Sequence, residues 1–338
     1  MQPSQKGARA VNPDTGRTSL MNTNSHTNSN PSPLLTLSPL VRHPANPILT
    51  PRDMPVECSA VFNCGAVRFE GDVLLLLRVE NFERATSFHV ARSKDGLQFD
   101  VCPEPIDYPL REIERKRGAS RFDMRITPLD GTFYVCHALW IDRLGSVIAT
   151  ARTDDFKRFE PIEAVSLPPN RNGVLFPERF NGRYARLERP QDIDGSGQIW
   201  LSYSPDLCHW GDFTPLEMPR VAWAYRKSGA GAAPIKTEAG WLIIYHATTM
   251  TASTENYYLG AMLLDLKDPS KVIAAPRKFL LAAEEVYECV GQVPNVVFTG
   301  GAVEMDDGTL NVYYGGADTR ICLATTTTDR LLDFCLHE

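Results

Sequence analysis

Two arginines, Arg171 and Arg189, lie near the ends of a segment with the pattern of a hairpin. Between them are a strand-like apolar run, Val174–Phe176, and an Asn181-Gly182 pair, which is typical of a tight turn between two strands. A guanidinium group donates two parallel hydrogen bonds to an oxyanion, so two fixed arginines suit a small, multiply charged anion such as phosphate. The alternative interpretation is a pair of surface arginines on a hairpin.

Asp123, in the segment Arg121–Thr127, is the candidate for proton transfer. We expect it to precede a strand through Ile126 and to lie at the wall of a binding site. An apolar, partly closed environment raises the pKa of a carboxyl group, which would allow Asp123 to donate a proton. The alternative is a structural Asp–Arg pair with Arg125.

A repeated pattern predicts the elements that position these residues. A glycine after a turn residue precedes an alternating apolar run five times, at Gly71, Gly131, Gly182, Gly240 and Gly308. A second element follows each run and contains an aspartate, at Asp95, Asp155, Asp206, Asp268 and Asp329. Strand-rich repeats of about 50 to 60 residues with turn signals are typical of propeller blades. We therefore predict an all-β, five-bladed β-propeller; the alternative is a β-sandwich with accidental internal similarity.

Polar residues recur at shared positions relative to the turn glycines, in three pairs: Arg78 with Arg189, His137 with His246, and Asn63 with Asp123. The innermost strands of a propeller surround a central channel, where small-molecule sites form. Charged groups inside apolar runs are costly unless they are paired or bind a ligand. We therefore expect these residues to meet around the common axis.

Three further residues are candidates for ligand binding. Lys227 precedes the small-residue segment Ser228–Gly231 and belongs to the same repeat as His246, which favours a ligand role over that of a core histidine. Asp318 follows small residues that would allow close approach of a ligand, although a turn aspartate is the alternative. Tyr257 fits either packing or binding.

Composition limits the class of protein. The 338 residues carry a net charge of −6, and the mixed-charge run from Arg111 to Arg121 is interpreted as a solvated loop or short helix, so a nucleic-acid partner is not expected. The eight cysteines show no zinc-like spacing and are interpreted as mostly buried thiols, so no metal is expected. No apolar run approaches the roughly 18 residues that span a bilayer, and no secretory signal is recognised. A cytoplasmic location is the default expectation.

The first part of the chain differs in composition from the rest. Residues 1–33 are rich in Ser, Asn, Thr and Pro and poor in large apolar groups, which predicts a disordered N-terminal extension. Residues 34–338 are predicted to form one propeller domain.

The chain resembles the mannoside phosphorylases of glycoside hydrolase family 130. The resemblance rests on motifs spread over nearly all of residues 44–334: Asn46–Leu49, Leu77–Glu80, Ala91–Gly96, Asp123–Thr127, Asn172–Glu178, Arg189-Pro190, Ala233–Thr237, Ile244–His246, Leu259–Ala261, Leu264–Leu266, Val293–Phe298 and Tyr313–Asp318. Two features depart from the family pattern. Phe122 and Met124 flank the aspartate where the family usually has an acidic residue and a proline, and Asn81 stands where it often has Asp.

The resemblance implies a five-bladed propeller and a role for each candidate residue. Asp123 would be the general acid, acting directly or through a sugar hydroxyl. The phosphate-binding residues would be Arg171, Asn172, Arg189, Lys227, His246 and Tyr257. The mannosyl unit would be held by Arg78 and Asp318, and we add Asn63 from its shared register with Asp123.

One carboxylate suffices for such a reaction because phosphate is already an anionic nucleophile, whereas an inverting hydrolase needs a second carboxylate to activate water. The expected activity is inverting phosphorolysis of β-1,4-mannosides, either mannooligosaccharides or mannosyl-glucose, with inorganic phosphate as co-substrate, no other cofactor, and α-mannose 1-phosphate as product. The alternatives are a hydrolase with Glu80, Glu178 or Asp318 as base, and a non-catalytic sugar-binding propeller. Acceptor preference is expected to depend on loops or on contacts in a homo-oligomer.

Overall fold

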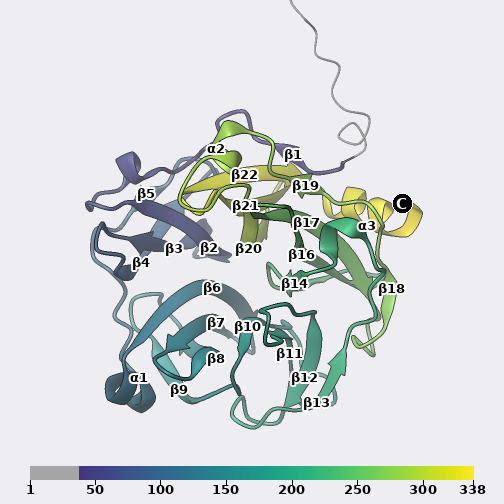
Figure 1. Ribbon diagram of the computed structural model, residues 1–338, viewed down its shortest axis with the longest axis horizontal. Coiled ribbons are helices and arrows are strands. Elements are labelled where there is room, and N and C mark those ends of the chain that lie inside the picture. The colour runs from purple at the N-terminus through teal and green to yellow at the C-terminus, as the bar shows by residue number, and fades with distance from the viewer. Residues whose placement is uncertain (1–37) are drawn as a thin grey trace, which may run out of the picture. The chain divides into compact units, whose positions relative to one another are not determined.

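The computed structural model describes residues 38–338. The predicted disordered extension, residues 1–33, and the first residues of the predicted propeller domain lie outside the described part. Five antiparallel sheets are arranged in a ring, which confirms the predicted five-bladed β-propeller (Figure 1). Residues 38–338 contain no helix with the length and apolar character that crossing a bilayer requires.

Each of the first three blades consists of four strands in chain order. Blade 1 contains β2 (Ala60–Phe69), β3 (Asp72–Glu80), β4 (Thr86–Ser93) and β5 (Asp100–Val101). Blade 2 contains β6 (Ala119–Leu129), β7 (Thr132–Ile141), β8 (Gly145–Thr153) and β9 (Glu160–Val165). Blade 3 contains β10 (Asn170–Leu175), β11 (Tyr184–Pro190), β12 (Trp200–Ser204) and β13 (Gly211–Pro215).

The last two blades depart from this plan. Blade 4 is built on β14 (Lys227–Ala230), β16 (Trp241–Met250), β17 (Glu255–Leu264) and β18 (Val272–Ala274), with β15 (Ile235–Lys236) and β19 (Leu281–Ala282) at its sides. Blade 5 contains β20 (Val297–Glu304), β21 (Leu310–Gly316), β22 (Arg320–Thr326) and β1 (Val41–Arg42). The α-helices are α1 (Glu112–Arg117), α2 (Val286–Cys289) and α3 (Thr328–His337), and two 3-10 helices, η1 and η2, cover Pro51–Asp53 and Ala222–Ala224.

The turn glycines lie at the positions that the repeat predicts, directly before the second long strand of each blade. Gly71 and Gly131, with φ of 84° and 79°, occupy the left-handed region that a tight hairpin turn requires. The prediction that the five aspartates occupy one shared position in the blades is only partly right. Asp95 accepts hydrogen bonds from the backbone N–H groups two and three residues later, and Asp155 and Asp206 do the same.

In blade 4 this turn is made by Asp265 and not by the predicted Asp268. Asp329 instead lies in the first turn of α3, where Thr327 caps the helix. The similar spacing of Asp268 and Asp329 therefore does not reflect a shared position in the blades.

The apolar run in β3 shows how one strand serves two cores. Leu74 and Leu76 pack with residues of blade 2. Leu75 and Leu77, on the opposite face, pack with residues of blade 5. Side chains alternate between the two faces of a strand, so a strand covered on both sides is apolar at every position. The predicted alternation is therefore absent from this run, which is apolar at consecutive positions because β3 is buried between neighbouring blades.

The ring is closed by β1, which pairs with β22 and so completes blade 5 from the other end of the described chain. Arg42 of β1 donates from Nε and Nη2 to the carboxylate of Glu288, at 2.8 Å and 2.9 Å. Glu288 is fully buried and also accepts a hydrogen bond of 2.8 Å from the Tyr314 hydroxyl. The two-residue strand is thus fixed mainly by its side chain.

Replacing Arg42 tests this closure. We expect Arg42→Ala to lower the free energy of unfolding by about 3 kcal/mol, because the buried Glu288 carboxylate loses its charged partner. Urea unfolding followed by tryptophan fluorescence measures the change, with Arg52→Ala, an exposed arginine in the turn after β1, as the matched control. Equal losses of stability in the two variants would contradict the role of Arg42 in closing the ring.

Candidate active site

Three β-bulges place polar side chains at the centre of the ring. The pairing register shifts in the inner strands of blades 1, 2 and 3, at Asn63, Asp123 and Asn172, respectively. These three residues have positive φ of 50°, 59° and 55°. A bulge redirects a side chain out of the regular alternation, and Asn and Asp tolerate left-handed backbone better than most residues. Asp123 thus lies within β6, and not before the strand as predicted.

Asp123 has two side-chain partners from blade 1. Its Oδ1 accepts hydrogen bonds from Asn63 Nδ2 at 3.0 Å and from Arg78 Nη1 at 3.2 Å. The predicted alternative, a pair with Arg125, is only indirect, because Arg125 Nη1 donates to the backbone oxygen of Asp123 at 2.9 Å. The carboxylate therefore pairs with Arg78.

The charge state of Asp123 differs from the sequence expectation. Burial opposes ionisation, but the nearby charges of Arg78, Arg125 and Arg171 outweigh it, and the pKa of Asp123 lies below its ordinary value. The expectation of a raised pKa is wrong because it considered the apolar strand and not the arginines around the carboxyl group. Burial and the neighbouring Asp123 carboxylate instead raise the pKa of Asp318 to about 7.

A basic cluster lies on the side of the centre formed by blades 3 and 4. Arg171 and Arg189 face each other across β10 and β11, as the predicted hairpin requires. Arg189 Nη1 lies 3.3 Å from His246 Nε2, and His246 is fully buried. Burial and then Arg189 hold the pKa of His246 well below its usual range, so the imidazole is neutral and accepts the hydrogen bond.

The remaining predicted phosphate residues adjoin this cluster. Tyr257 stacks on His246, with ring centroids 6.3 Å apart. Burial raises the pKa of Tyr257, which keeps its hydroxyl protonated. Lys227 donates to Glu255 at 2.7 Å, so its charge is already paired. Asn172 and His246 enclose Gly229 so closely that a Cβ there would lie 2.8 Å from Asn172 Oδ1 and 2.6 Å from His246 Cε1.

Several buried polar atoms in this region have no hydrogen-bond partner among the described residues. They include Arg125 Nη2, Arg189 Nε, Asn172 Oδ1, His246 Nδ1 and Asn63 Oδ1. Buried polar groups in folded proteins are almost always paired, so a group of unpaired donors and acceptors at one place indicates a site for a polar ligand. The donors on arginines are suited to the oxygen atoms of an anion.

The structure thus brings all ten predicted site residues to the centre of the ring: Asn63, Arg78, Asp123, Arg171, Asn172, Arg189, Lys227, His246, Tyr257 and Asp318. His137 does not join them, because its Nε2 is bonded to the Tyr108 hydroxyl at 2.8 Å in the core between blades. Glu178, the predicted alternative base, is paired with Lys236 in an exposed hairpin.

Sequence reasoning missed the contribution of Phe122. Its ring lies under the guanidinium groups of both Arg78 and Arg171, with centroid distances of 5.4 Å and 4.9 Å. The residue was noted only as a departure from the family pattern. An aromatic face attracts both cations without neutralising them, so Phe122 fixes the two arginines and leaves their charge available to a ligand.

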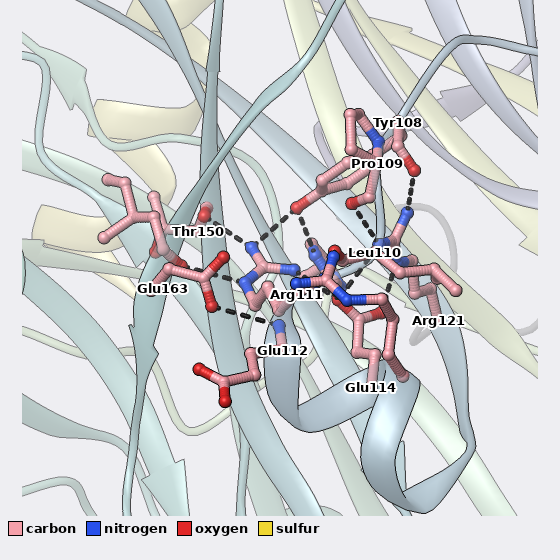
Figure 2. Close-up of polar contacts among 12 residues, drawn as sticks. Tyr108, Pro109, Leu110, Arg111, Glu112, Glu114, Arg121, Thr150 and Glu163 are labelled. Carbon is pink, nitrogen blue, oxygen red and sulfur yellow. Dashed lines mark hydrogen bonds and ion pairs between the residues drawn. The ribbon is translucent and has the colours of Figure 1, made fainter.

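A second buried cluster anchors the first part of β6 through Arg121, which lies two residues before Asp123. Figure 2 shows Arg111 and Arg121 converging on Glu114 of α1, with bonds of 3.1 Å and 2.6 Å. Arg111 is fully buried and also donates to the Tyr108 hydroxyl at 2.7 Å. The short helix is present as predicted, but Arg111 is not solvated, because beside its local pair with Glu114 it donates hydrogen bonds to the backbone oxygens of Thr150 and Ile162 in blade 2.

A five-bladed propeller whose centre combines two largely buried carboxyl groups with several arginines has the groups of a class of enzyme that uses an acid together with a bound oxyanion. Comparison with known proteins narrows this class. The family model described as beta-1,4-mannooligosaccharide phosphorylase matches residues 39–337. The chain belongs to this family, glycoside hydrolase family 130.

Individual relatives support the family over almost the whole chain. The β-1,4-mannooligosaccharide phosphorylase of Ruminococcus albus is 36% identical over 304 residues, which cover 87% of this chain and 90% of the relative. The 1,2-β-oligomannan phosphorylase of a Thermoanaerobacter species is 37% identical over 290 residues, covering 82% and 94%. The β-1,2-mannobiose phosphorylase of Listeria innocua, solved with β-1,2-mannobiose, has a TM-score of 0.78 at 29% identity, covering 88% and 99%.

The raised pKa of Asp318 predicts a pH-dependent stability difference. A carboxyl group whose pKa is higher in the folded state stabilises the fold below its unfolded pKa, and this contribution is lost as the pH rises to about 7. Asp318→Asn removes the buried charge, so its melting temperature should exceed that of the wild type at pH 8 and approach it at pH 5. Thermal unfolding at both pH values measures this, with the exposed Glu238→Gln as control. A difference in melting temperature that does not depend on pH would contradict the raised pKa of Asp318.

Proposed function

We propose that the protein is an inverting phosphorylase that cleaves β-1,4-linked mannosides with inorganic phosphate and releases α-mannose 1-phosphate. The observation that carries the proposal is the convergence of Arg171, Arg189 and neutral His246 beside Asp123. Family membership supports the β-mannoside class. The match to the Ruminococcus albus enzyme favours the β-1,4 linkage, although relatives of similar identity act on β-1,2-mannosides.

In this mechanism phosphate is held by Arg171, Arg189 and His246, with Asn172, Lys227 and Tyr257 around it. The mannosyl unit lies beside Asn63, Arg78 and Asp318. Phosphate attacks the anomeric carbon from the face opposite the leaving oxygen, which inverts the configuration. No step requires a metal ion or an organic cofactor.

Asp123 supplies the proton to the leaving oxygen, directly or through a sugar hydroxyl. The arginines by themselves favour its carboxylate form. The negative charge of bound phosphate offsets these arginines, so the pKa of Asp123 rises when phosphate is present. The acid therefore becomes competent when the nucleophile is in place. A hydrolase would have no comparable use for the basic cluster, which is why we favour phosphorolysis.

Arg189→Ala and Asp123→Asn separate the two proposed roles. Arg189→Ala should weaken phosphate binding by about 100-fold, or roughly 3 kcal/mol, because a buried charge-assisted contact is lost. Asp123→Asn should stop both phosphorolysis and the reverse synthesis while phosphate still binds. Initial rates against phosphate concentration and calorimetric titration with phosphate measure these effects. Arg183→Ala, on the same hairpin as Arg189 but at its turn and with a half-exposed side chain, is the control. Equal rates with and without phosphate in the wild type would refute the proposal.

The linkage is tested by running the reaction in reverse. Incubation of α-mannose 1-phosphate with glucose, N-acetylglucosamine, mannose or β-1,4-mannobiose should release phosphate with the preferred acceptor. NMR of the product should show a new bond at O4 of that acceptor. A bond at O2 would exclude the β-1,4 assignment while leaving phosphorolysis intact.

A further inference from the structure

A groove outside the central cluster has the features of a second binding site. It lies between blades 2 and 3 and has a volume of about 640 Å³. The groove adjoins β10 and β11, the strands that carry Arg171 and Arg189, but neither arginine lines it. Asn170 and Pro190, which do line it, form the neighbouring pair of residues across the same two strands. The residues that give it its character are Leu167, Asn170, Glu188, Trp200, Trp210 and Phe213.

We call this the blade 2–3 groove. Its floor is a buried ion pair in which one carboxylate oxygen accepts no hydrogen bond from the described residues. Arg186 and Glu188 have side chains only 2% and 1% exposed. Both Nε and Nη2 of Arg186 donate to the same oxygen of Glu188, Oε2, at 2.8 Å and 2.5 Å. The other oxygen, Oε1, is buried and has no hydrogen-bond partner among the described residues, and the same holds for Asn170 Oδ1. Both atoms need a donor that a ligand can supply.

The walls of the groove are aromatic and partly open. Arg186 lies over one face of the Trp210 ring at 3.8 Å, which fixes the ring in position. Trp200 lies opposite Glu188 in the next strand, β12. Phe213 on β13 is 50% exposed and Leu167 is 84% exposed, so the mouth presents apolar surface to a ligand. Wide apolar walls with a few fixed polar atoms are the usual composition of a small-molecule site.

These features select the chemistry of the ligand. Arg186 and Glu188 neutralise each other, and the unpaired atoms at the floor are both acceptors, so a phosphate or carboxylate would meet oxygen atoms and gain no charge attraction. A neutral molecule with hydroxyl donors and an apolar face fits better. A pyranose ring has both, because its hydroxyl groups project from its edge and its C–H groups form apolar faces that pack on aromatic rings.

We propose that the blade 2–3 groove is a second, non-catalytic site that binds a segment of β-mannoside chain. The choice of mannoside over other sugars rests on the proposed function. Bound there, a chain would remain on the enzyme between cycles of cleavage, with Glu188 and Asn170 accepting its hydroxyl groups and Trp200 and Phe213 packing on its rings.

Two exposed cysteines allow a test that does not depend on turnover. Cys208 lines the groove, whereas Cys102 follows β5 in blade 1, and both thiols are free and exposed. The full-length enzyme is treated with N-ethylmaleimide without phosphate, with and without β-1,4-mannotriose, and the labelling of each cysteine is followed by peptide mass spectrometry. Mannotriose at about ten times its Kd should slow labelling of Cys208 by about tenfold and leave Cys102 unchanged.

A substitution at the mouth of the groove tests whether sugar bound in the groove causes the protection of Cys208. Phe213→Ala should raise the mannotriose concentration needed to protect Cys208 by about tenfold. It should leave phosphorolysis of mannobiose unchanged. Ile273→Ala, on the outer strand β18 of blade 4 and 47% exposed, is the matched control and should have no effect on protection. Thermal unfolding of both variants confirms that they are folded.

The outcomes separate this inference from the proposed function. Phosphorolysis of mannobiose with no protection of Cys208 by mannotriose would overturn the second site and leave the proposed function standing. Protection without any phosphorolysis would support the second site and refute the proposed function. Protection that depends on enzyme concentration and not on sugar would overturn the inference, because the groove would then be covered by a second copy of the chain.

Discussion

The repulsion among buried cations at the centre of the propeller is the constraint on which the site depends. Arg125 and Arg189 are almost completely buried, and burial together with neighbouring positive charge lowers the pKa of Arg189 to about 10. The Asp123 carboxylate is the negative group that Arg78, Arg125 and Arg171 share, and Glu80 pairs with Arg78 as well, so one carboxylate faces several cations. An anion that enters such an arrangement relieves the repulsion, so the site is organised to receive an oxyanion, which under the proposed function is phosphate.

The fold supplies this arrangement through a repeated local irregularity. Asn63, Asp123 and Asn172 each stand at a bulge with left-handed backbone in the innermost strand of a blade. A regular strand would direct these side chains into the apolar layers between blades. The bulges turn them to the axis, and the rigid sheets on both sides hold them there. Strain of this kind is a common feature of functional sites.

The sequence was sufficient to predict the repeat and the convergence of polar residues, because turn glycines such as Gly71 and residues of the inner strands recur in step. It could not predict the closure by β1, since a strand of two residues has no periodicity and its pairing is set by Arg42 and Glu288. The charge state of Asp123 and the position of Phe122 between two arginines also depend on contacts across blades. His137 shares its register with His246 but turns into the core, where Tyr108 bonds to it.

The central claim is that an inorganic anion, and not water, attacks the sugar. The most direct measurement is phosphorus and proton NMR of the first product formed when the enzyme acts on β-1,4-mannobiose in phosphate buffer. The account predicts that α-mannose 1-phosphate appears from the start, in amounts equal to the bonds cleaved. Free mannose as the only glycosyl product, or mannose 1-phosphate of the β configuration, would contradict it.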